Sequence, residues 1–161
     1  MLGFATEEDL LTSLEADLRL VPSVRVVDRQ RDDWAHLTAA LPEAGDIAYP
    51  FIFINDARST YDAQILCNLF RKRLTVFLVC GVEVQSDDDN DLTKVRGQLD
   101  TALNAFLRGV VGVIHSNTHR TLAGRDLAYR SQVVGVNKDG GYLFPQAVAI
   151  INVEMTFFDK Q

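Results

Sequence analysis

Two long stretches in which apolar residues occupy every second position constrain the fold of this chain more than any other feature. In the first stretch these residues are Leu74, Val76, Leu78, Cys80, Val82 and Val84. In the second they are Ala147, Ala149, Ile151, Val153, Met155 and Phe157. Successive side chains of a β-strand point to opposite faces, so this period predicts long strands with one face in a core.

Four further segments also predict strands, but their apolar patterns are less regular. The segment AYPFIFIN, residues 48–55, is apolar on both faces, as in a strand buried on two sides. Residues 61–69 also alternate, although a helix would place several of their apolar residues on one face. A short strand is predicted over SVRVVDR, residues 23–29, and an alternating strand over RDLAYRSQVVGV, residues 125–136.

Apolar residues three or four positions apart predict three helices. The first follows Thr6, a predicted N-cap, and the second is a short helix around Trp34 in residues 31–45. The third begins near Leu92 and places Val95, Leu99, Leu103 and Phe106 on one face. Residues 110–124 have no clear period, and residues 137–146 are rich in turn formers.

The predicted order is α, β, α, β, β, β, α, β, β, which is neither a strict βαβ alternation nor an all-β meander. It indicates an α+β fold, with a mostly antiparallel mixed sheet and helices packed on one face. A length of 161 residues fits a single domain covering residues 1–161. Hydrophobic residues make up 47% and charged residues 24%, as in soluble globular proteins.

The formal net charge of −6 argues against a general nucleic-acid binder, which would present a basic surface. The N-terminal sequence lacks the features of a standard secretion signal, and no apolar run is long enough to cross a membrane. We therefore expect a soluble protein with no membrane partner. Cys67 and Cys80 lie in apolar alternating segments, which predicts reduced core residues and weakly favours a cytoplasmic origin.

No nucleophile elbow, phosphate-binding loop or dinucleotide-binding motif is present, so we expect neither an enzyme nor a cofactor. The acidic run Asp87–Asp91 fails as a calcium loop, because Leu92 and Gln98 stand where that loop needs Gly and Glu. It is interpreted as a solvated turn that caps the following helix. His36 is interpreted as a surface or boundary residue.

A small metal-assisted hydrolase stays open as an alternative. It would use His115 and His119, four positions apart, with carboxylates from Asp87–Asp91 or Asp126. No third ligand lies close to the histidines in sequence, so no metal site is assigned.

The basic run Arg71-Lys72-Arg73, together with Arg58, is the remaining candidate for function. One interpretation is a solvated strand end whose charges keep a sheet edge from pairing with another chain. The other is one side of a contact between copies of the protein. In the second interpretation it would pair with the acidic run of a neighbouring copy. The candidate interface residues are Arg58, Tyr61, Asp62, Arg71, Lys72, Arg73, Asp87, Asp88 and Asp89.

The order of these segments resembles the tail terminator proteins of long-tailed bacteriophages, from about residue 6 to residue 158. The segments that carry the resemblance are VVDR, YPFIFIND, RLTVFLVCGV, DNDLTKV and the closing LAYR…GGYLFPQAVAIINVEMTFF. The chain departs from the family pattern in a longer front section and in a longer segment between Ile54 and Leu74.

The resemblance implies a structural virion protein, made in the host cytoplasm, that caps the tail tube as a hexameric ring. Such a ring ends tube polymerisation and offers the surface for head joining. Its expected partners are further copies of itself, the tail tube protein, a head-completion or neck protein, and genomic DNA that passes through the lumen without specific binding. Another head–tail joining protein, such as a neck or connector component, is the alternative within this class.

Overall fold

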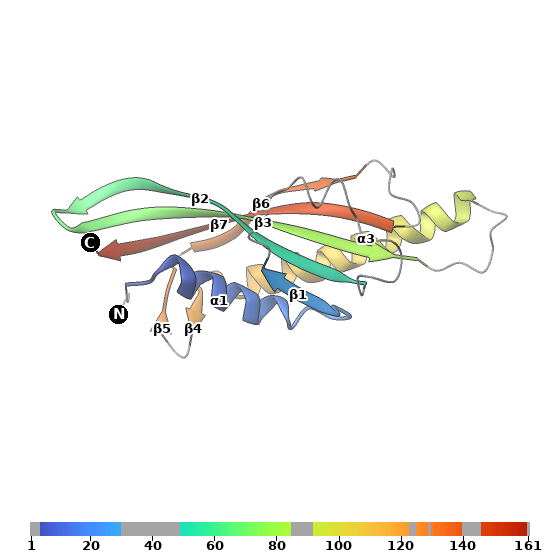
Figure 1. Cartoon of the computed structure of the whole chain (residues 1–161), viewed down its shortest axis with the longest axis horizontal. Helices are drawn as coiled ribbons and strands as arrows, with labels where there is room; N and C mark the ends of the chain where they lie inside the picture. The colour runs from blue at the N-terminus through green and yellow to red at the C-terminus, as the bar shows by residue number, and fades with distance from the viewer. Residues whose placement is uncertain are drawn as a thin grey trace.

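A five-stranded sheet with helices on one of its faces forms the body of the protein (Figure 1). The computed structural model describes residues 4–29, 49–84, 92–122, 125–128, 130–139 and 146–160. The predictions for the Trp34 helix, His36 and the Asp87–Asp91 run, and residues 140–145 of the turn-rich segment 137–146, lie outside these ranges. The elements are α1 (Glu7–Leu18), β1 (Val26–Arg29), β2 (Phe51–Leu66), β3 (Leu69–Glu83), α3 (Leu92–Ser116), β4 (Thr121–Leu122), β5 (Arg125–Asp126), β6 (Arg130–Lys138) and β7 (Gln146–Lys160).

The strand order of the main sheet is β1-β2-β3-β7-β6. β1 pairs with β2 in parallel, and all other neighbours in this sheet are antiparallel. β4 and β5 form a separate two-stranded hairpin. The predicted α+β class, with a mostly antiparallel mixed sheet, is confirmed.

Both described helices pack on the same face of the sheet. The predicted apolar faces of α1 and α3 join the alternating residues of β3 and β7 in one core cluster. Its helical members are Leu10, Leu11, Leu14, Leu18, Leu99, Leu103, Phe106, Leu107, Val110 and Ile114. The alternating positions of β3 from Leu74 to Val82, and those of β7 from Ala147 to Phe157, are all buried, as their period predicts.

α1 begins with the capping arrangement that its sequence predicts. The Thr6 hydroxyl accepts a hydrogen bond from the Asp9 backbone N–H, and the Asp9 carboxylate accepts one from the Thr6 backbone N–H. α3 runs further than predicted, to Ser116, and takes in half of the segment without a clear period. Val110 and Ile114 in this extension are completely buried, so packing against the sheet stabilises the helix there.

The prediction of three separate strands between the second and third helices is wrong. β2 runs without a break from Phe51 to Leu66 and turns at Cys67 and Asn68 into β3. The basic run therefore lies inside β3 and not at a strand end. The prediction that Cys67 is a core residue is also wrong, because its side chain is exposed at the turn, whereas Cys80 is buried.

The opposite face of the sheet carries a smaller apolar cluster at the start of β2. Phe51, Phe53 and Val79 are buried there, and the rings of the two phenylalanines stack with centroids 4.5 Å apart. Every residue from Phe51 to Asn55 is buried, which confirms the prediction of a strand covered on both sides. Gly81 fits this packing, since a β-carbon added to it would lie 2.2 Å from the Phe51 ring.

Candidate functional site

The outer part of the β2–β3 hairpin contains six of the nine predicted interface residues. We call residues 58–73 the hairpin arm. None of these residues is buried, in contrast to the first five residues of β2. The turn of the arm extends past the first turn of α1, toward the end of the molecule where both termini lie (Figure 1).

On the face of the arm away from the helices, Asp62 joins two of the basic residues. Its carboxylate accepts hydrogen bonds from Arg71 Nε at 2.8 Å and from an Arg73 terminal nitrogen at 3.3 Å. Arg73 Nε also lies 3.4 Å from the Glu154 carboxylate on β7. The strand register shifts between Tyr61 and Ala63, so Asp62 is the extra residue of a bulge. The bulge aims this carboxylate at both arginines.

Lys72 points to the other face, toward α1. Its ammonium group lies 3.1 Å from Asp159 and 3.8 Å from Glu7. The same group stands 4.8 Å from the centroid of the Tyr61 ring, and that ring packs edge-on against Phe70. Lys72 is therefore held in a cage of aromatic and acidic groups from its own chain, where cation–π attraction adds to the charge pairing.

The end of the arm exposes apolar side chains. Tyr61, Ile65 and Leu66 have 58%, 46% and 63% of their surface exposed. Large apolar side chains that are exposed close together are a feature of binding surfaces. The arm thus ends in an apolar tip, formed by Ile65 and Leu66, behind which the charged residues lie.

The outer edge of β2 is irregular as well as open. Among the described strands β1 pairs with β2 only from Phe51 to Ile54, so the arm has no described partner on that side. The pairing of β2 with β3 shifts register at three places, after Asp56, after Tyr61 and after Gln64. Bulges of this kind interrupt the regular row of backbone donors and acceptors that another strand would need. The structure therefore disfavours simple strand addition at this edge.

The predicted pairing between the basic run and the acidic run of a neighbour stays a prediction. Arg71, Lys72 and Arg73 each have an acidic partner in their own chain. Arg58 is exposed, and no ion pair joins it to another described residue. Asp87, Asp88 and Asp89 lie outside the described residues. Sequence reasoning found the basic residues of the arm but missed that one bulged aspartate would hold two of them.

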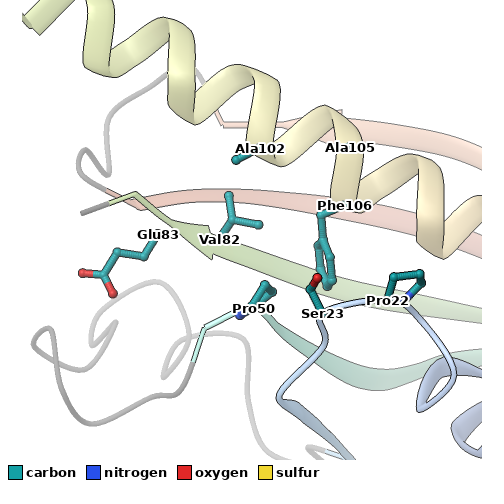
Figure 2. Close-up of a pocket in the computed structure, with 8 residues that line it drawn as sticks. All are labelled: Pro22, Ser23, Pro50, Val82, Glu83, Ala102, Ala105 and Phe106. Atoms are coloured by element: carbon teal, nitrogen blue, oxygen red, sulfur yellow. The ribbon is translucent and has the colours of Figure 1, made fainter. Parts of the chain in front are cut away.

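A pocket of about 320 Å³ lies at the opposite end of the same two strands. Figure 2 shows α3 on one side of it, with Phe106 directed toward Ser23 and Pro50. Its apolar lining consists of Pro22, Pro50, Val82, Ala102, Ala105 and Phe106. Ser23 and Glu83 add polar groups, and Glu83 is the single ionisable residue in the described lining. Burial, together with the negative charge of Glu83, raises the pKa of nearby Tyr49.

The histidines of the hydrolase alternative are not brought into a ligand cluster by the residues that the structure describes. His115 lies in the last turn of α3, and its Nε2 accepts a hydrogen bond from the Val133 backbone N–H on β6. The helix ends before His119, so the two imidazoles do not follow one helical face. Within the described ranges, no three His, Cys, Asp or Glu residues are grouped as metal ligands would be.

No protein-family model matches the sequence, and no curated protein was found to be similar to it. Among the described helices, none is both long enough and apolar enough to span a bilayer.

Proposed function

We propose that this protein is a structural subunit that assembles into a ring, and that the ring caps a phage tail tube as a tail terminator. The observation that carries the proposal is the hairpin arm, which has an apolar tip, no buried residue and no described strand partner on its β2 side. Ordered strands whose apolar side chains stay exposed in their own chain are typical of elements that become buried in an assembly.

Charge supports contacts between copies of this chain. The arm carries four basic side chains and one acidic side chain, a net charge of +3, within a chain whose net charge is −6. The rest of each copy is therefore strongly acidic, and an arm is attracted to the body of a neighbour. Opposite charges on different parts of one surface favour a head-to-tail contact, and such contacts close into rings when the rotation between copies allows it.

The assignment to tail termination rests on the resemblance in segment order, to which the α+β fold with its long central strands adds support. In this role the ring binds the last layer of the tail tube protein, stops its polymerisation and presents a surface to a neck protein, so the protein is located in the virion. A ring with an acidic lumen would let genomic DNA pass without binding it, since like charges repel.

The test is the mass of the purified protein in solution. We expect light scattering at high protein concentration to give a closed oligomer of about six copies, and negative-stain images to show rings. High salt should weaken the assembly, because it screens the attraction between arm and body. A protein that stays monomeric at every concentration and salt level would contradict ring formation. Rings that do not bind tail tubes but bind heads would favour the neck component instead.

A further inference from the structure

The pocket and the arm tip lie at opposite ends of one strand pair. Pro50 precedes β2 and Glu83 ends β3, whereas Leu66 ends β2 at the turn. A strand of 16 residues spans about 50 Å at about 3.3 Å per residue. The tip of a copy therefore cannot reach its own pocket. If the tip enters such a pocket, the pocket belongs to another copy, and the contact is head-to-tail.

The two surfaces are complementary in chemistry. The described pocket walls are apolar except for Ser23 and Glu83, and the tip presents the exposed side chains of Ile65 and Leu66. The described part of the chain provides no ion pair for Glu83. Close to the tip, Arg71 donates through Nε to Asp62, and its two terminal nitrogens make no hydrogen bond with a described residue. A guanidinium with free terminal nitrogens can bind a second carboxylate.

We propose that the hairpin tip of one copy inserts Leu66 and Ile65 into the α3 pocket of the next copy, where Arg71 pairs with Glu83. This inference rests on the proposed ring and names the contact that closes it. The bulges of β2 disfavour regular strand addition, so we assign the contact to the side chains of the tip and not to its backbone. The occupant is a second copy because the basic arm and the acidic body complement each other within the same sequence.

A cross-linking experiment tests the contact directly. The native Cys67 is exposed at the turn beside Leu66, and Ala105→Cys places a second thiol at the exposed rim of the pocket. Diamide oxidises the two thiols to a disulfide and is itself reduced to the hydrazine. Such a bond requires the two α-carbons to approach within about 7 Å. Cys80 does not interfere, because it is completely buried.

We expect Ala105→Cys to give a ladder of covalent multimers that ends at the mass of the ring on a non-reducing gel. The ladder should be absent from the same variant carrying Cys67→Ser. It should also be absent from Arg130→Cys, which places a thiol on an exposed residue of β6, opposite Thr156 and away from the pocket lining. Rings that form without the Ala105→Cys ladder would overturn the tip-in-pocket contact and leave the proposed function intact. A failure of the protein to form rings at all would overturn both.

Exchanging the charges provides an independent readout. Arg71→Glu or Glu83→Arg alone should weaken the assembly about tenfold or more, as for the loss of a central charged contact. The double variant, which carries both changes, should recover most of that loss. Leu66→Asp should abolish rings while circular dichroism shows an unchanged monomer. Equal assembly in all four variants would contradict the contact.

Discussion

The two halves of the β2–β3 hairpin belong to one continuous strand pair but lie in opposite environments. From Phe51 to Asn55, β2 is buried on both faces, with the helical layer on one side and the Phe51–Phe53–Val79 cluster on the other. From Arg58 to Arg73 no residue is buried. The inner half stabilises the fold, whereas the arm contributes little burial to it. The sequence of the arm is therefore free to serve contacts outside the chain.

The same contrast holds for charged groups. In the body, the completely buried Arg120 pairs with Asp17 and donates to Ser131, which ties α1 to β6. In the arm, Asp62 and its two arginines are partly exposed to solvent. A buried charge that loses its partner is left without solvation, while an exposed charge is solvated by water. The two aspartates should therefore differ sharply in their effect on stability.

The largest expected effect tests this difference. Asp17→Ala leaves the buried Arg120 guanidinium without its carboxylate and should lower the free energy of unfolding by about 3–5 kcal/mol. Asp62→Ala removes the exposed partner of Arg71 and Arg73 and should cost about 1 kcal/mol or less. Urea unfolding of both variants measures the two values. Equal losses would show that the arm is as essential to folding as the body.

Two leucines, one in the body and one in the arm, test the same difference in burial with uncharged side chains. Leu78 on β3 is completely buried in the main core, and Leu78→Ala should cost about 2–5 kcal/mol through lost burial and the remaining cavity. Leu66→Ala at the tip should change monomer stability by about 0.5 kcal/mol or less, since the side chain is exposed. The midpoints of urea unfolding, taken at low protein concentration, report both. A large loss from Leu66→Ala in the monomer would place the tip inside the fold of its own chain.

The sequence predicted the body better than the arm, and the reason is burial. Period two over Leu74–Val82 and Ala147–Phe157 arises from one buried face, so it identified both strands and their faces correctly. The separate alternation over residues 61–69 includes Cys67, but neither face is buried there, and it led to the wrong prediction of a core cysteine. Alternation signals a core only where a second layer covers the strand.

The candidate site could be predicted only in part, because some of it depends on contacts between distant segments. The basic residues of the arm are adjacent in sequence and were recognised. Arg120 and Asp17 are 103 residues apart, and the pocket combines residues that precede β1 and β2 with the end of β3 and one face of α3. No local pattern marks such groups. The bulge at Asp62 was missed for a similar reason, since it is defined by its register against β3.

The smallest expected effect concerns acid stability at the edge of the body. Glu15 on α1 accepts hydrogen bonds from Arg19 and Arg29, each at 2.8 Å, and so joins α1 to β1. The hydrogen bond from Arg19 is the largest influence on its carboxyl group; with the charge of Arg29 it outweighs the opposing effect of burial and lowers the pKa of Glu15.

A carboxyl group whose pKa is lower in the folded protein stabilises the fold above its unfolded pKa, and this stabilisation is lost as the pH falls through the folded pKa. Glu15→Gln should therefore cost about 1 kcal/mol or less at neutral pH. The difference from the wild type should shrink toward zero as the pH falls below the ordinary range of a glutamate. Unfolding curves for the wild type and the variant at neutral and acidic pH measure this closing gap. If the difference in free energy of unfolding between the wild type and Glu15→Gln stays constant or grows in acid, the carboxylate of Glu15 does not hold β1 against α1.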